Sequence, residues 1–160
     1  MNLILWRHAE AGDACADLEA DLSRPLTKGG LRDAVLGANW LRSRLPPRTR
    51  IVVSPATRAI ETAKTLTDTF EICAALGPDS DVETVLSAID WPHSGGGLGR
   101  HGGLVLVGHQ PWLGQLAALL LAGEQAAWSV KKGSIWWLAR RMRGESEQTV
   151  LRAVLSPDFL

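Results

Sequence analysis

The sequence predicts a single α/β domain, a three-layer sandwich in which helices cover both faces of a mainly parallel sheet. Three short apolar runs predict its strands, at Leu3–Trp6, Ile51–Val53 and Leu104–Val107. Their apolar character is continuous rather than alternating, which is typical of parallel strands buried on both faces. Segments with helical spacing separate them, as crossovers between parallel strands require. Two later runs, Ser134–Arg140 and Thr149–Leu155, predict a hairpin and allow an antiparallel edge strand.

Four helices are predicted between these strands. Thr27 is a suitable N-cap for the first, which Pro46 and Pro47 end, while Ser54 and Pro55 form a cap and first-turn pair for the second. Their apolar stripes are Leu31, Ala34, Val35, Ala38, Leu41 and Leu45, and then Ile60, Ala63, Leu66 and Phe70. The shorter third helix carries Val82, Val85, Leu86 and Ile89, and the fourth, opened by Pro111, carries Leu113, Leu116, Ala117, Leu120 and Leu121.

Charge and cysteine usage exclude several classes of protein. The 160 residues include 17 Lys/Arg and 17 Asp/Glu, so bulk electrostatics favour neither nucleic acid nor an anionic membrane as partner. Cys15 and Cys73 show no spacing for a disulfide framework or a zinc site. There is no basic leader and no apolar stretch of roughly 18 residues, so we expect a cytoplasmic protein.

Some polar and aromatic residues receive a structural interpretation. The basic residues from Lys131 to Arg143 are read as a solvated hairpin face, and the acidic residues from Asp13 to Asp21 as a solvated loop. The glycines around Gly95 indicate a connector, with His93 and His101 as surface residues. Trp6, Trp136 and Trp137 are expected in the core, and Trp112 is a candidate pocket wall.

Two histidines follow predicted parallel strands. His8, with Arg7 before it, comes after the first strand, and His109 comes after the last. Arg58 lies in the first turn of the helix after the middle strand. Because ligands bind outside the carboxyl ends of strands in open α/β sheets, we expect these four side chains to line one pocket.

Two arginines and two histidines fit the chemistry of a phosphoryl group. Arginine is always charged, and its forked donors match phosphate oxygens. A neutral imidazole can attack phosphorus, which makes His8 the candidate nucleophile. His109 would act best protonated, and a nearby phosphate raises the pKa of such a group. Arg7, Arg58 and His109 could then neutralise the developing charge, so we expect no metal and no cofactor. No glycine-rich nucleotide cradle is present.

Four segments occur in the order typical of one family. They are Arg7-His8-Ala9, Arg24-Pro25-Leu26-Thr27, Ser54-Pro55-Ala56-Thr57-Arg58 with Glu61-Thr62-Ala63, and Gly108-His109. In these segments the chain resembles the histidine phosphatase superfamily, also called the phosphoglycerate mutase-like family. Its small size and the Arg-Pro-Leu-Thr segment are most similar to the SixA-type phosphohistidine phosphatases of bacteria.

The resemblance implies a phosphoglycerate mutase-like fold and a phosphohistidine intermediate on His8. It also implies phosphate contacts from Arg7, Arg58 and His109, with a supporting role in substrate binding for Arg24. Many members have glycine where this chain has Ala9, so we expect no backbone angle there that needs glycine.

The leaving-group acid of larger members has no assigned counterpart here. Asp79, Asp81 and Glu83 lie in the corresponding region, but nothing in the sequence aims one of them at the site. We hypothesise that a phosphohistidine substrate reduces the need for this acid, because imidazole leaves from a weaker bond than an alkoxide does.

Three of the candidate residues also have a purely structural interpretation. Arg58 could form a salt bridge with Glu61 or Glu10, His109 a loop hydrogen bond, and Arg24 could be a solvated charge. These interpretations do not explain why two arginines and two histidines all lie at strand ends or in a first helical turn, so the catalytic hypothesis is favoured.

The favoured partner is a phosphohistidine protein, and the alternative is a small phosphorylated metabolite. A non-catalytic phosphate-binding module is the hypothesis from a different class, and the presence of both His8 and His109 argues against it.

Overall fold

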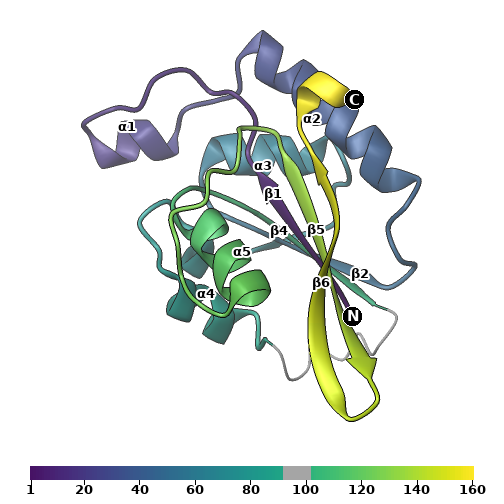
Figure 1. Ribbon diagram of the computed structural model, residues 1–160. Helices are drawn as coiled ribbons and strands as arrows, with labels where there is room; N and C mark the ends of the chain where they lie inside the picture. Colours follow the sequence, from purple (N-terminus) through teal and green to yellow (C-terminus); the bar gives the residue numbers. More distant parts are fainter. Residues whose placement is uncertain (92–101) are drawn as a thin grey trace.

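A six-stranded sheet in the order β3-β2-β4-β1-β5-β6 forms the centre of the molecule (Figure 1). The computed structural model describes residues 1–91 and 102–160. The four strands from β3 to β1 in this order are parallel, and the β5–β6 hairpin continues the sheet antiparallel to β1. The predicted sandwich, with a mainly parallel sheet and an antiparallel edge, is confirmed.

The elements alternate along the chain as the sequence predicts. The strands are β1 (Asn2–Arg7), β2 (Thr49–Val53), β3 (Glu71–Ile72), β4 (Gly103–Gly108), β5 (Ile135–Arg143) and β6 (Ser146–Leu155). The helices are α1 (Leu18–Leu22), α2 (Lys28–Arg42), α3 (Thr57–Lys64), α4 (Val82–Ala88) and α5 (Trp112–Ala122), with 3-10 turns η1 (Ala74–Leu76) and η3 (Pro157–Phe159). β3 and α1 were not predicted, because two and five residues are too few to show a period in the sequence.

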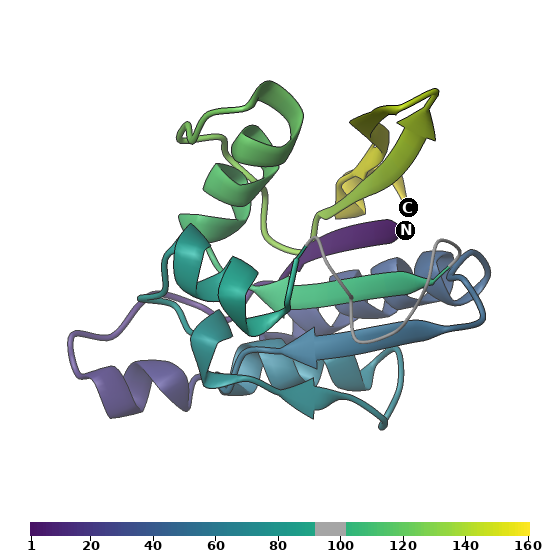
Figure 2. The same ribbon diagram turned by 90° about the horizontal axis from the view of Figure 1, so that it is seen from below.

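Two apolar cores fill the spaces between the three layers. α2 and α3 pack with Ile4 and Trp6 on one face of the sheet, and α4 and α5 pack with Leu3 and Leu5 on the other (Figure 2). Neighbouring residues of one strand thus enter different cores, which explains why the parallel strands are apolar throughout.

Most tryptophans occupy the positions expected of them. Trp6 and Trp137 are buried and Trp136 is half-buried. Trp112 is fully buried and packs against Gly108, where a Cβ would lie 2.1 Å from its ring. Trp112 is therefore a core residue beneath the end of β4, and its interpretation as a pocket wall is wrong.

α2 approaches the sheet through small residues rather than through its large ones. Leu31 and Val35, expected in the core, are 49% and 41% exposed. The buried residues are Gly30, Ala34, Gly37, Ala38 and Leu41. A Cβ on Gly37 would lie 3.3 Å from the Trp6 ring. The large side chain at this contact is therefore Trp6 of the sheet, and α2 supplies the small residue.

α3 is shorter than its apolar stripe predicted. It begins at Thr57 with Ala56 as N-cap, and it ends at Lys64 before reaching Phe70. Ser54 lies two residues before this N-cap, and its hydroxyl contacts His109 and accepts from the Ala56 N–H at 3.2 Å.

Some predicted features lie in residues that the structure does not describe. The connector around Gly95, with His93 and His101, lies outside the described residues. Within residues 1–91 and 102–160, no helix is long and apolar enough to cross a membrane.

Gly30 sets the distance between α2 and the segment after β1. A Cβ on Gly30 would lie 2.0 Å from the carbonyl oxygen of Glu10, so Gly30→Ala must push two backbones apart. We expect the free energy of unfolding, measured with urea, to fall by about 1–3 kcal/mol. Gly29→Ala is the matched control, because its Cβ would have 3.7 Å of room. Equal destabilisation in the two variants would contradict this packing.

Candidate active site

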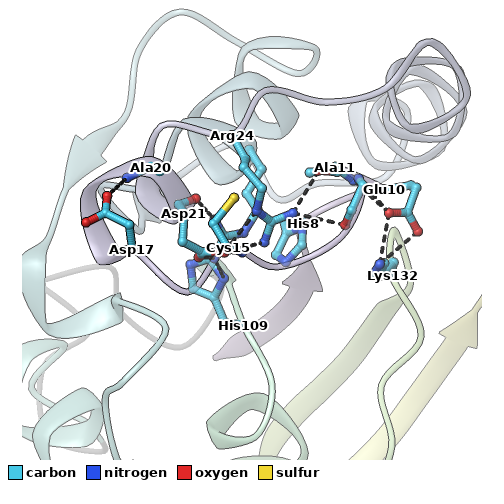
Figure 3. A network of polar contacts seen from close by, with 12 residues as sticks. His8, Glu10, Ala11, Cys15, Asp17, Ala20, Asp21, Arg24, His109 and Lys132 are labelled. Carbon is cyan, nitrogen blue, oxygen red and sulfur yellow. Dashed lines mark hydrogen bonds and ion pairs between the residues drawn. The ribbon is translucent and has the colours of Figure 1, made fainter.

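The register of β1 against β4 brings the two histidines together. Arg7 pairs with Gly108, so His8 and His109 each follow directly after paired residues. The His8 N–H donates to the Gly108 carbonyl at 3.1 Å, and the centroids of the two imidazole rings lie 5.0 Å apart. Figure 3 shows both rings beneath the loop that contains α1.

His8 is held as a neutral imidazole with one free lone pair. Its Nδ1 lies 2.7 Å from the Ala9 carbonyl oxygen, which can only accept, so Nδ1 carries the proton and Nε2 does not. Burial lowers the pKa of His8 from 6.5 to about 3, and the charges of Arg58 and Arg7 act in the same direction. At neutral pH, Nε2 of His8 is therefore available as a nucleophile.

His109 is also neutral in the free site. Its Nε2 lies 2.7 Å from Ser54 Oγ, and its Nδ1 lies 3.5 Å from Nη2 of Arg58. Because a guanidinium can only donate, Nδ1 is the acceptor and the Nε2 proton points at Ser54. Burial lowers the pKa of His109 to about 2, with His8 and the two arginines adding to the effect. The protonation of His109 beside a phosphate, expected from the sequence, stays a prediction.

Each of the two arginines has one buried donor without a partner in the described part of the chain. Arg58 is only 3% exposed, and Arg7 donates through Nη1 to the Val130 carbonyl at 2.7 Å. Nε of Arg7 and Nε of Arg58 are buried without a hydrogen-bond partner among the described residues. Unpaired buried donors are costly, and an anion bound between the arginines would relieve that cost.

Asp21 is the acidic partner of Arg58. Arg58 donates through Nη1 to the Asp21 carbonyl at 2.6 Å, and its Nη2 lies 3.1 Å from the Asp21 carboxylate. The alternatives considered from the sequence, Glu61 and Glu10, are wrong. Glu61 accepts from the Leu26 N–H, and Glu10 pairs with Lys132.

The pKa of Asp21 shows which role this carboxylate can take. Burial acts to raise its pKa, but the Cys15 N–H and the charges of Arg24 and Arg58 together lower it. Asp21 therefore stays ionised and balances part of the positive charge of Arg58 and Arg24. The interpretation of this segment as a solvated acidic loop is wrong for Asp21.

Arg24 stabilises the loop above the pocket. It lies 2.9 Å from the Asp21 carboxylate and donates to the carbonyls of Ala11 and Gly12 at 2.7 and 3.0 Å (Figure 3). These contacts fit a supporting role, and a direct contact between Arg24 and phosphate stays a prediction.

Three further residues of the site were missed. Ser54 and Thr62 stand in the quoted motifs, but one was assigned as a helix cap and the other received no role. Thr62 Oγ1 accepts from the Ala9 N–H at 3.1 Å and donates to the Arg58 carbonyl at 2.7 Å, which connects the loop after His8 to α3. Lys132 precedes the β5–β6 hairpin, so its assignment to a hairpin face is wrong, and it contacts both carboxylate oxygens of Glu10.

The balance of charges suits a dianion. With both histidines neutral, the remaining charged groups carry two more positive than negative charges. They are Arg7, Arg24, Arg58 and Lys132 against Asp21 and Glu10. In residues 1–91 and 102–160, no cluster of three His, Cys, Asp or Glu side chains could hold a metal ion. The arrangement can therefore attract a phosphoryl group through side chains.

The histidine pKa values predict a loss of stability in mild acid. Both values, about 3 and about 2, lie below the ordinary 6.5 that the unfolded chain regains. Below pH 6.5 the unfolded state thus binds more protons, and the free energy of unfolding falls as pH drops toward 3. The slope is up to about 1.4 kcal/mol per pH unit for each histidine. Urea unfolding at pH 7.5, 6 and 5 measures it, above the range where carboxylates titrate.

His109→Gln is the control for this pH dependence. It keeps a polar side chain but cannot titrate, so we expect a shallower slope between pH 6 and pH 5 than in the unchanged chain. The same slope in both proteins would show that His109 does not titrate differently on folding.

Comparisons with known proteins agree on one family. Residues 3–79 match the histidine phosphatase superfamily (branch 1). The phosphohistidine phosphatase SixA of Escherichia coli K12 is 32% identical over 132 residues, which cover 78% of this chain and 76% of that protein.

Solved structures extend the likeness to nearly the whole chain. The protein histidine phosphatase SixA complexed with tungstate superposes with a TM-score of 0.75 at 27% identity, covering 99% of this chain and 98% of that one. A mycobacterial glucosyl-3-phosphoglycerate phosphatase reaches a TM-score of 0.69 at 20% identity, covering 95% and 97%, and supports the fold alone. The chain belongs to the histidine phosphatase superfamily and is a phosphatase.

Proposed function

We propose that this phosphatase hydrolyses phosphohistidine on another protein through a phosphoryl group carried covalently by His8. The observation that carries the proposal is the neutral His8 ring, whose Nδ1–H is fixed on the Ala9 carbonyl while Nε2 is free. The buried Nε donors of Arg7 and Arg58 supply charge-assisted hydrogen bonds for the phosphoryl oxygens.

The first step transfers the phosphoryl group to the enzyme. Nε2 of His8 attacks phosphorus, the bond to the substrate's imidazole nitrogen breaks, and its electron pair stays on that nitrogen. The leaving imidazole takes up any proton it needs from solvent, because no residue is assigned as general acid. Asp21 is a poor candidate, since its pKa is lowered.

The second step regenerates His8. Water attacks the phosphorus of phospho-His8, the phosphorus–nitrogen bond breaks, and phosphate leaves with the oxygen of that water. In both steps a phosphoryl group beside His109 raises the pKa of this histidine. A second proton on His109 would enter at Nδ1, because Nε2 already carries one toward Ser54, and the 3.5 Å contact of Nδ1 with Nη2 of Arg58 would then have to open.

Thr62 acts in this scheme as a positioning residue. The Thr62 hydroxyl accepts a hydrogen bond from the Ala9 N–H, and the Ala9 carbonyl accepts one from Nδ1–H of His8. The chain from Thr62 through Ala9 thereby fixes both the tautomer and the direction of the nucleophile.

The substrate class is argued from the leaving group and from the relatives. A site without an assigned acid suits imidazole, which leaves more easily than an alkoxide. The E. coli relative is named a phosphohistidine phosphatase. The mycobacterial glucosyl-3-phosphoglycerate phosphatase with the same fold keeps a small phosphorylated metabolite as the second candidate.

His8→Ala tests the covalent mechanism. With chelator present, we expect the unchanged chain to hydrolyse both a phosphohistidine peptide and an aryl phosphate, and His8→Ala to lose about 10⁴-fold or more in kcat. Rapid quench with a radiolabelled phosphoryl donor should trap a label that is stable in base and labile in acid, absent from His8→Ala.

Each other outcome of this experiment has its own meaning. Loss of activity with chelator would contradict metal independence. An inert wild-type chain that still binds phosphate would be a binding module, and a strong preference for the aryl phosphate would favour small-molecule substrates.

Thr62→Val tests the positioning role. Valine keeps the shape but removes the acceptor for the Ala9 N–H, so we expect kcat to fall about ten- to a hundredfold with a smaller change in KM. Thr62→Ser keeps the hydroxyl and should restore most of kcat. If both variants lowered kcat equally, the hydroxyl would not position His8.

A further inference from the structure

A groove of about 330 Å³ lies beside the phosphate pocket. Leu18 and Leu22 of α1 form one wall, and Pro55, Ala74, Ala75 and Pro78 contribute to the other. These side chains are apolar or small, in contrast to the charged pocket next to them. The volume is at the small end of ligand sites, which suits one or two side chains of a larger molecule.

Both walls of the groove continue directly from residues of the site. Leu22 follows Asp21, whose carboxylate contacts Arg58, and Pro55 follows Ser54, whose hydroxyl contacts His109. An extended chain advances only about 3.5 Å per residue. A polypeptide with its phosphorylated side chain in the pocket would therefore place a residue close in sequence at this groove.

α1 presents its apolar side chains without covering them. No residue of α1 is buried, and Leu18 is 58% exposed. Figures 1 and 2 show α1 standing apart from the helical layers, and polar contacts of Asp17 and Asp21 hold its segment. A single exposed leucine is common on protein surfaces. Here two leucines face a wall of alanine and proline next to the candidate active site, and such an apolar surface is typical of an interaction site.

The charges around the groove select the kind of chain it can receive. Residues 12–23 contain four Asp or Glu and residues 71–91 contain five, with no Lys or Arg in either segment. Of these carboxylates, Asp21 is paired with Arg58 and Glu71 with Arg50, so the excess of negative charge comes from the others. Asp79 itself lies on the groove wall and is exposed. Across the pocket the rim is the Glu10–Lys132 ion pair, which offers no apolar surface of this kind. A basic segment is attracted to the groove side, whereas an acidic one is repelled.

We propose that this groove binds the polypeptide that carries the phosphohistidine, taking an apolar side chain that lies next to basic residues. The inference rests on the proposed function and makes it specific. The substrate is then chosen by the chain that flanks the phosphorylated residue, since the phosphate pocket alone accepts any phosphoryl group.

Three synthetic phosphohistidine peptides of equal length test the preference. The first has Leu and Lys within three residues of the phosphohistidine, the second replaces Leu with Ser, and the third replaces Lys with Glu. We expect kcat/KM to be highest for the first and about tenfold lower for the second. The penalty for Glu should shrink as salt is added, because the groove charges are exposed. Equal values for all three peptides would overturn the proposal.

Variants of the groove locate the effect. Leu18→Ser should lower the ratio of kcat/KM for the Leu–Lys peptide to that for an aryl phosphate by about tenfold. Asp79→Asn should reduce the penalty for the Glu peptide. Leu151→Ser is the matched control, because Leu151 is 48% exposed on β6, away from the groove lining. The same change of ratio in Leu18→Ser and Leu151→Ser would overturn the assignment.

The two proposals fail in different ways. A wild-type enzyme that hydrolyses the aryl phosphate but none of the peptides contradicts the phosphohistidine substrate itself, and the groove proposal falls with it. Hydrolysis of all peptides without discrimination contradicts the groove alone.

Discussion

The parallel pairing of β1 with β4 is the constraint on which the site depends. With Arg7 opposite Gly108, the chain leaves both strands at the same level, and the histidine that follows each strand enters the same space. A shift of one residue would turn the side chains at one strand end to the other face. The fully buried strand interiors oppose such a shift, because two apolar cores would lose their packing.

Burial then gives the site its chemistry. A solvated histidine would be partly protonated near neutral pH, whereas His8 and His109 have lowered pKa values and remain neutral. The same burial leaves Nε of Arg7 and Nε of Arg58 without hydrogen-bond partners in the part of the chain that the structure describes. Two unsatisfied donors thus lie near a neutral imidazole, an arrangement that a phosphoryl dianion would complete.

The loop containing α1 links that chemistry to recognition. Asp21 compensates part of the positive charge of Arg58 and Arg24. With the Glu10–Lys132 pair included, the site keeps an excess of two positive charges, equal and opposite to the charge of one phosphate dianion. The residue after Asp21 lines the groove, so the loop that contributes to the charge of the pocket also forms one wall of the groove. A chain bound in the groove would contact the segment that holds Arg58.

The sequence by itself determined the sandwich, the strand ends and the identity of the candidate catalytic residues. These features depend on local patterns, since an apolar run followed by Arg7 and His8 can be recognised from a few neighbouring residues. Only the tertiary structure decided that Arg58 pairs with Asp21, that Ser54 serves His109 rather than capping α3, and that α2 contacts the sheet through small residues. The physical reason is that partners and protonation depend on which distant segments exclude water from each other. No local pattern records that exclusion.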